Sequence, residues 1–145
     1  MFMGEYNHSI DAKGRIIVPA KLREGLSDQF VVTKGLDGCL FCYPNDEWNN
    51  FEEKLKTLPL TNKSARQFTR FFLAGAAQCE VDKQGRILLP AVLREFAGLD
   101  KEVVFIGSAS RVEIWSKDKW EECKSVYDEQ MDDIAESMEE LGFSL

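Results

Sequence analysis

A fourteen-residue motif that occurs twice is the feature of this chain that most constrains its fold. The first copy runs from Asp11 to Glu24 and the second from Asp82 to Glu95, and both read Asp-x-x-Gly-Arg-Ile-x-x-Pro-Ala-x-Leu-Arg-Glu. Each half of the 145-residue chain has only about 70 residues, a size at which a single hydrophobic core is marginal. We therefore expect two halves that share one core, assemble into oligomers, or do both.

The elements around the motif follow the same order in both halves. A predicted strand, at about 5–10 or 76–81, precedes each copy, and Gly14 or Gly85 supplies the positive φ that the turn after it needs. β-branched and aliphatic residues then predict a second strand, which a proline stops before a short helix. These strands and helices are predicted at 15–18, 19–26, 86–89 and 90–97.

Each short helix carries a Leu-Arg pair. We expect Leu22 and Leu93 to face the core, while Arg23 and Arg94 stay near solvent. Two further strands follow in each half.

Longer amphipathic helices are predicted outside the motifs, and their apolar stripes are expected to pack the body and to supply subunit contacts. These helices span 45–58, 61–73 and 117–141. Strands and helices together predict an α+β fold. We divide the chain into a first repeat with its closing helix (1–58), a linking helix (59–75) and a second repeat with an acidic C-terminal helix (76–145).

The net charge of −7 first argues against a nucleic-acid partner, but the distribution of charge changes that conclusion. Residues 117–145 hold three basic and ten acidic residues, so residues 1–116 balance at 15 basic and 15 acidic. Within this neutral body the two motifs are locally basic. A basic face on a neutral body is sufficient to bind phosphate.

The Asp-x-x-x-Arg unit of each motif has a structural and a binding interpretation. As folding elements, Asp11 pairs with Arg15 and Asp82 with Arg86 across the turn, although an exposed ion pair contributes only about 0–1 kcal/mol. As a binding element, each arginine presents a planar fork of donors that suits phosphate or the O6/N7 edge of guanine. The aspartates would then orient the arginines, and Lys13 would approach a DNA groove beside Arg15. On the residues alone both interpretations stay open.

A catalytic interpretation would use Asp11 and Asp82 as a carboxylate pair across a pseudo-two-fold axis. The arginine four residues after each aspartate would keep both ionised and oppose the sharing of a proton. His8 is the only histidine, and neither a Gly-rich phosphate loop nor a nucleophile-elbow serine is present. We therefore expect no enzyme activity, no catalytic residue and no cofactor.

Cys39 and Cys42 form a CxxC pair, which invites a zinc or redox interpretation. A zinc site needs about four ligands, and the remaining candidates, Cys79, Cys123 and His8, are not paired at ligand spacing. The pair also lies in an apolar run that is typical of a strand. We expect small buried side chains and no metal.

No segment approaches the roughly 18 consecutive apolar residues of a membrane-spanning helix. Residues 1–6 lack the basic flank and apolar run of a signal peptide. We expect a cytoplasmic protein with no membrane partner.

The chain resembles the MraZ family of bacterial transcriptional regulators. The resemblance rests on the N-terminal run Met-Gly-Glu-Tyr-Asn-His-Ser-Ile-Asp-Ala-Lys-Gly-Arg at 3–15, on the two Asp-x-x-x-Arg units and on the spacing of the halves. It extends from Met3 to about Met138 and so covers nearly the whole chain.

That resemblance implies an AbrB-like swapped-hairpin fold, in which two β-hairpin-and-helix units interlock as a pseudo-two-fold barrel with helices outside. It implies double-stranded DNA as a partner, a ring-shaped homo-oligomer (an octamer or similar) and association with the nucleoid. The implied function is sequence-specific regulation, mainly repression, of the division and cell wall gene cluster that contains its own gene. The operator would consist of direct repeats.

The same resemblance implies that Arg15 and Arg86 are the principal DNA-contacting residues, joined by Lys13. In the second copy the lysine, Lys83, stands one place earlier and Gln84 takes the place of Lys13, so the two copies need not contact DNA equally. The residues expected to shape each turn and to orient its arginine are Asp11, Gly14, Asp82 and Gly85.

An alternative is an AbrB-like oligomeric module whose main partner is another protein, as in antitoxins that hold a toxin on their C-terminal segment. The amphipathic C-terminal helix favours this alternative. Two fused units in one chain argue against it, because antitoxin tails usually follow a single unit.

Overall fold

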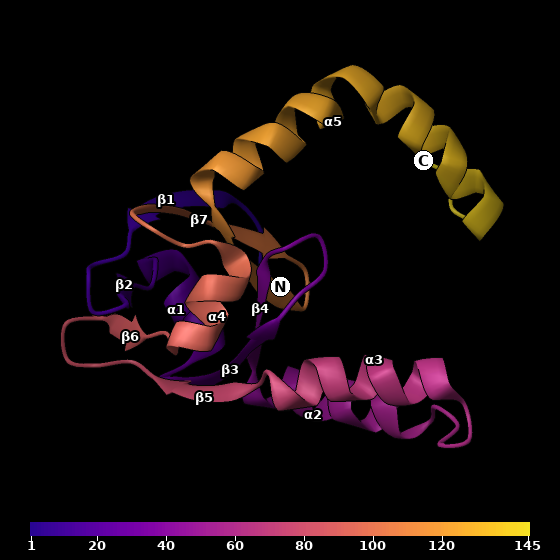
Figure 1. Cartoon of the computed structure of the whole chain (residues 1–145). Coiled ribbons are helices and arrows are strands. Elements are labelled where there is room, and N and C mark those ends of the chain that lie inside the picture. The colour runs from indigo at the N-terminus through magenta and orange to yellow at the C-terminus, as the bar shows by residue number, and fades with distance from the viewer.

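The computed structural model describes all 145 residues and has the α+β architecture that the sequence predicts (Figure 1). Strands and helices alternate in the same order in the two halves, apart from the linking helix α3. In chain order the elements are β1 (Glu5–Ser9), β2 (Arg15–Ile17), α1 (Ala20–Leu26), β3 (Gln29–Lys34), β4 (Leu40–Pro44), α2 (Asn45–Lys56), α3 (Lys63–Ala74), β5 (Ala77–Glu80), β6 (Arg86–Leu88), α4 (Ala91–Ala97), β7 (Glu102–Ser108), β8 (Arg111–Ser116), α5 (Lys117–Met138) and a final 3-10 turn (Glu139–Leu141).

Strand pairing crosses between the halves. A six-stranded antiparallel sheet has the order β1-β7-β8-β4-β3-β5. Thus β1 of the first half pairs with β7 of the second, while β5 of the second half pairs with β3 of the first. Neither half completes its sheet alone, which accords with the expectation of one shared core.

The second strands of the two motifs pair with each other. β2 and β6 run antiparallel, with Ile16 opposite Ile87. Two further backbone bonds lengthen this pairing, because Val18 N donates to Gly85 O and Leu89 N donates to Gly14 O, both at 2.9 Å. We call residues 14–18 and 85–89 together the central ribbon.

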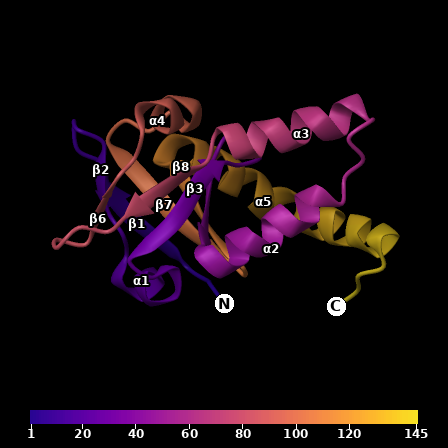
Figure 2. The same ribbon diagram turned by 90° about the horizontal axis from the view of Figure 1, so that it is seen from below.

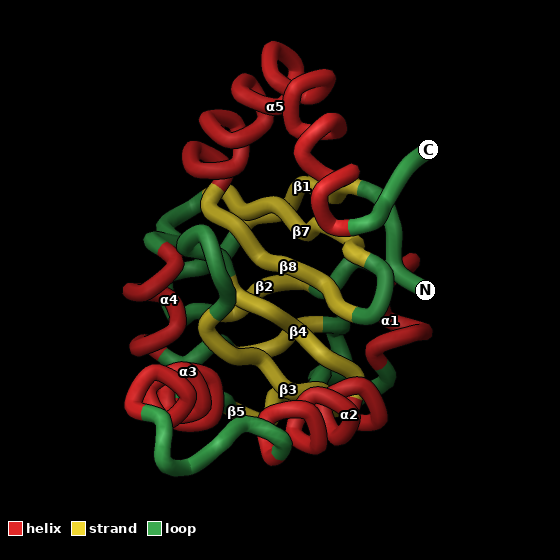
Figure 3. Tube along the Cα trace, turned by 90° about the vertical axis from the view of Figure 1, so that its right-hand side faces the viewer, coloured by secondary structure: helices red, strands yellow, loops and turns green.

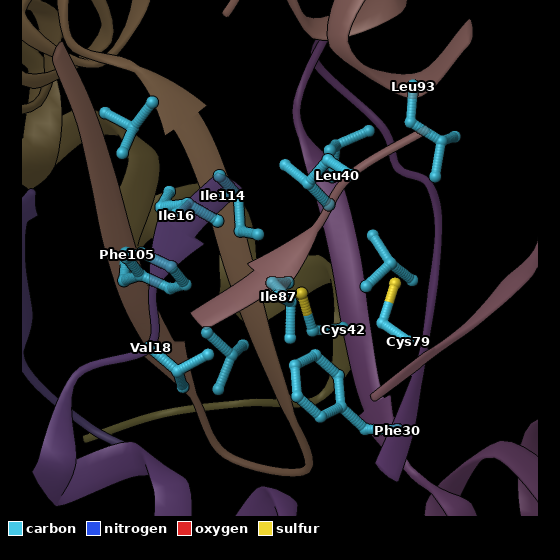
Figure 4. Packing of buried hydrophobic residues seen from close by; sticks show 14 of the residues in the cluster. Ile16, Val18, Phe30, Leu40, Cys42, Cys79, Ile87, Leu93, Phe105 and Ile114 are labelled. Carbon is cyan, nitrogen blue, oxygen red and sulfur yellow. The ribbon is translucent and has the colours of Figure 1, made fainter. Parts of the chain in front are cut away.

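The main core lies between the central ribbon and the six-stranded sheet (Figure 4). Ile16 and Ile87 point into it from the ribbon, and Leu22 and Leu93 from the short helices, all about 98–99 % buried. The placement of these leucines confirms the prediction. Prolines 19 and 90 stand at the N-caps of α1 and α4, one position before the helix begins.

A second, largely aromatic cluster forms where α2 and α3 leave the sheet. Phe72 of α3 packs on Phe41, Phe51 and Phe68, and the buried Thr33 hydroxyl donates to the Phe72 carbonyl at 2.6 Å. The side chain of Asn62 caps α3 by accepting from Ala65 N. Helix α2 ends at Lys56, before the predicted end at Leu58. Leu58 precedes Pro59, and a residue before a proline is disfavoured in helical conformation.

Helix α5 contacts the body only through its first turns, where Trp120 packs on Trp115. None of its residues is buried, and Tyr127 and Met131 are 38 % and 46 % exposed. The helix projects away from the body near the β1–β7 edge of the sheet, whereas the α2–α3 pair lies near the β3–β5 edge (Figures 1 and 3). Figure 2 shows the turns of the central ribbon at one end of the molecule, with the α2–α3 pair and α5 extending toward the other end.

Candidate nucleic-acid interface

The first motif turn is closed by one carboxylate. Asp11 Oδ1 accepts from the backbone N–H groups of Lys13, at 3.0 Å, and Arg15, at 2.9 Å. Its other oxygen, Oδ2, accepts from Arg15 Nε at 2.7 Å. Gly14 has φ +88°, a conformation that side-chain-bearing residues rarely adopt. The aspartate therefore shapes the turn and fixes the direction of the arginine at the same time.

The second turn repeats this geometry. Asp82 Oδ1 accepts from the backbone N–H groups of Gln84 and Arg86, both at 2.9 Å, and Oδ2 accepts from Arg86 Nε at 3.0 Å. Gly85 has φ +79°. Gln84 thus stands where Lys13 stands in the first turn. The predicted ion pairs of both motifs are present in the structure.

Both aspartates are held in the charged form. Hydrogen bonds from the backbone N–H of the following arginine, joined by its side chain, lower the pKa of Asp11 and of Asp82 below the usual aspartate value. Two carboxylates whose pKa values are both lowered do not share a proton. This electrostatic environment opposes the acid–base use of the pair.

The two arginines lie on one surface of the molecule. In the ribbon register Arg15 stands opposite Leu88, and Ile17 stands opposite Arg86. Because side chains alternate along a strand, Ile16 and Ile87 face the core while the other four residues face outward. Arg15 and Arg86 are therefore diagonal neighbours, with Cα atoms roughly 7–8 Å apart. Each motif contributes one strand to this single outer face, so one surface carries both arginines.

Sequence reasoning did not identify Ile17 and Leu88 as part of this face. They are 45 % and 60 % exposed, between the two arginines. The signal was present in the alternation of the strand, but the pairing of one motif with the other is needed to see it. At the turns, the predicted residues Lys13, Lys83 and Gln84 are exposed and flank the ribbon.

The prediction that Arg23 and Arg94 stay near solvent is wrong. Both are half-buried against the turn of the other half. Arg23 Nη2 donates to Val18 O at 3.0 Å, and Arg94 Nε donates to Leu89 O at 3.1 Å. Helical position alone suggested solvent, but the guanidinium groups fold back over the ends of the ribbon strands.

The cysteine pair is divided between two cores. Cys42 belongs to the main core and Cys39 to the aromatic cluster, and both are fully buried as predicted. Burial raises the pKa of both thiols well above the ordinary cysteine value. The chain holds no group of three or more His, Cys, Asp or Glu side chains arranged to bind a metal ion.

A model of the family described as "MraZ protein, putative antitoxin-like" matches residues 1–71 and again residues 72–141. The two matches correspond to the two halves of the duplication. No helix of the chain is both long enough and apolar enough to cross a membrane.

Similar proteins carry the same family name. The protein named transcriptional regulator MraZ of Lachnoclostridium phytofermentans is 65 % identical over 144 residues, covering 99 % of each chain. Those of Thermoanaerobacter sp. strain X514 and Clostridium beijerinckii are 62 % and 61 % identical, each covering 98 % of this chain and 99 % of the relative. The duplicated family match and these full-length identities confirm the resemblance seen in the motifs: the chain belongs to the MraZ family.

Proposed function

We propose that this protein is a sequence-specific DNA-binding regulator of transcription that reads DNA with the outer face of the central ribbon. The observation that carries this proposal is the pair of arginines, Arg15 and Arg86, that their own aspartates hold on one exposed strand pair. A two-stranded ribbon fits a major groove about 12 Å wide. The curated relatives are named transcriptional regulators, which favours the same function.

Each site residue has a distinct part in this proposal. Arg15 and Arg86 keep their Nη groups for base edges or phosphates, since only Nε bonds to the aspartate. The aspartates Asp11 and Asp82 orient them, and Gly14 and Gly85 permit the turns. Flanking phosphate or groove contacts come from Lys13 in the first turn and from Lys83 and Gln84 in the second.

Family membership supports a finer proposal. We infer a repressor of the promoter of its own division and cell wall gene cluster, which binds direct repeats in the cytoplasm at the nucleoid. A gel-shift with duplex DNA from upstream of its own gene tests this, with the repeats scrambled in a matched duplex. Affinity should favour the native duplex and fall with salt at a log–log slope of about −0.9 per phosphate contacted. Equal binding of both duplexes would contradict sequence-specific recognition.

We also propose that the halves form an AbrB-like swapped-hairpin barrel, with the sequence units 1–58, 59–75 and 76–145 as its parts. The exchange of β1 and β5 between halves supports this classification.

A ring-shaped homo-oligomer, an octamer or similar, is the proposed assembly. Two surfaces away from the ribbon support it. A groove of about 420 Å³ lies between α2 and α3, where Leu55, Leu58 and Leu73 meet the cations Arg66 and Arg70. The chain beyond Lys124 has seven acidic residues and no basic one, and α5 leaves its apolar stripe uncovered. We infer that α5 of one copy seats in the groove of the next.

The second candidate function is an antitoxin-like module whose partner is a different protein. The exposed stripe of α5 favours it, because such a stripe would suit a protein partner as well as another copy. The identity of the neighbouring genes discriminates the two functions. A toxin gene favours this candidate, whereas cell wall and division genes favour the regulator.

A further inference from the structure

Each turn of the proposed interface is held by an arginine from the other half of the chain. We propose that Arg94 of α4 is the positioning residue for the first turn, Asp11–Arg15, and that Arg23 of α1 is the positioning residue for the second, Asp82–Arg86. The effect of these two arginines on DNA binding rests on the proposed function. Their contacts with the turns do not depend on it.

The Arg94 contact joins three backbone segments. Gly14 O accepts from Leu89 N at 2.9 Å, and Leu89 O in turn accepts from Arg94 Nε at 3.1 Å. The guanidinium lies directly on the turn, because a Cβ placed on Gly14 would stand 2.6 Å from Arg94 Nε and 2.7 Å from its Cζ. Gly14 is therefore enclosed between the ribbon strand of the second half and an arginine of that same half.

Arg23 makes the corresponding contact on the second turn. Gly85 O accepts from Val18 N at 2.9 Å, and Val18 O accepts from Arg23 Nη2 at 3.0 Å. A Cβ on Gly85 would stand 2.8 Å from Arg23 Cζ. Each half of the chain thus supplies the arginine that lies on the turn of the other half.

These arginines have no carboxylate partner. Neither Arg23 nor Arg94 takes part in any of the ion pairs of the chain. A half-buried cation that bonds only to a backbone carbonyl carries a desolvation cost that no carboxylate offsets. Here it fixes the glycine on which the turn bends, and it leaves one uncompensated positive charge beside each turn. Both effects favour an approaching phosphate.

The two contacts are not equal. Arg94 uses Nε for its carbonyl, whereas Arg23 uses Nη2 and leaves its buried Nε without a hydrogen-bond partner. An unsatisfied buried donor carries a desolvation cost. The first turn, held by Arg94, is therefore the better fixed of the two, and we expect its loss to have the larger effect.

Hydrogen exchange of the full-length protein tests the positioning without DNA. Arg94→Met keeps the side-chain stem but removes the donors, and it should speed amide exchange in the peptide that covers 11–15. The peptide that covers 82–86 should be unaffected. Arg23→Met is the matched variant and should show the reverse pattern. Arg94→Lys, which keeps a donor and the charge, should give exchange between that of the native chain and that of Arg94→Met.

Exchange that rises in the turn of the same half, or in neither turn, would overturn the proposal. Circular dichroism and the unfolding midpoint report whether Arg94→Met unfolds. If it does, Arg94→Lys decides the question by whether its faster exchange is confined to 11–15.

A double-mutant cycle on duplex DNA from upstream of its own gene tests the consequence. In the Arg86→Ala background, binding relies on the first turn, so Arg94→Met should weaken affinity about tenfold. In the Arg15→Ala background the first turn already lacks its arginine, so Arg94→Met removes only the positive charge beside the turn and should weaken affinity by clearly less than tenfold. Coupling of Arg94 to Arg86 instead of Arg15 would overturn the cross-half arrangement.

Failure of the two ideas is distinguishable. If Arg15→Ala and Arg86→Ala leave affinity for this duplex intact, the proposed function is wrong, while the exchange experiment still decides the positioning. If both weaken binding and exchange does not cross between the halves, the positioning is wrong and the function stands.

Discussion

At the scale of single residues, one carboxylate oxygen of Asp11 holds two backbone N–H groups while the other fixes Arg15. The structural and the binding interpretations of this unit are therefore compatible. The aspartate uses only Nε of the arginine and leaves the outer donors of its guanidinium for a ligand. Asp82 and Arg86 repeat the arrangement.

The carboxylates should titrate below the ordinary aspartate pKa of 3.8. A pKa that is lower in the folded state means that the turn is stabilised above pH 3.8, and that this stabilisation is lost as the pH falls through the folded-state pKa. Carboxyl titration by NMR should show the pKa of Asp11 rising when Arg15 is replaced by Ala. A pKa that is unchanged in Arg15→Ala would contradict the arginine's part in holding the charge.

Gly14→Ala should destabilise the protein for two reasons. The residue has φ +88°, and its added Cβ would meet Arg94 Nε at 2.6 Å. Gly98→Ala is the control, because Gly98 also has positive φ but its Cβ would meet only Lys119, at 3.6 Å. Chemical denaturation should show a free energy of unfolding lower for Gly14→Ala than for Gly98→Ala by about 1–3 kcal/mol. Equal losses would show that Arg94 moves aside without cost.

At the scale of elements, the sequence predicted most strands and helices because turn glycines, prolines and apolar spacing are local signals. The turn glycines Gly14 and Gly85, and the prolines Pro19 and Pro90 before the short helices, are examples. The pairing of β2 with β6 is not local. It joins Ile16 to Ile87, 71 residues apart, and no periodicity within either strand specifies that partner. The outer face of the ribbon, with Ile17 and Leu88, was missed for this reason.

The alternation along β6 predicts opposite effects at adjacent residues. Ile87 is 1 % exposed, so Ile87→Ala should lower the free energy of unfolding by about 2–5 kcal/mol. Leu88 is 60 % exposed, so Leu88→Ala should change stability by less than about 0.5 kcal/mol but weaken DNA binding. Denaturation and gel-shift measurements on the two variants check this. If Leu88→Ala destabilised the protein and left DNA affinity normal, the assignment of Leu88 to the DNA-binding face would be contradicted.

At the scale of the whole molecule, the duplication explains why one chain builds one ribbon. The halves exchange β1 and β5, so each supplies what the other lacks. The length of each half predicted a shared core, assembly into oligomers or both, but not which strands cross. Sequence reasoning also missed that Arg23 and Arg94 reach the opposite turns, because that contact exists only after the halves interlock.

The inferred contact between copies can be tested by charge reversal. Arg66 and Arg70 line the groove of α3, and Asp128 and Asp132 lie on one side of α5, each pair four residues apart. Arg66→Glu/Arg70→Glu alone and Asp128→Lys/Asp132→Lys alone should each disrupt assembly. An equal mixture should reassemble into rings in which the variants alternate, as native mass spectrometry would show. Variants that assemble alone, or a mixture that does not, would contradict this contact.

The central claim is that the ribbon's outer face binds DNA, and the double variant Arg15→Ala/Arg86→Ala tests it most directly. Lys54→Ala/Lys63→Ala removes the same charge from α2 and α3, which extend away from the ribbon (Figure 2), and is the matched control. On duplex DNA from upstream of its own gene, the ribbon variant should lose at least about thirtyfold in affinity, with its circular dichroism spectrum and assembly size unchanged. The control should bind within about twofold of the native chain. Native affinity in a folded ribbon variant would contradict the account.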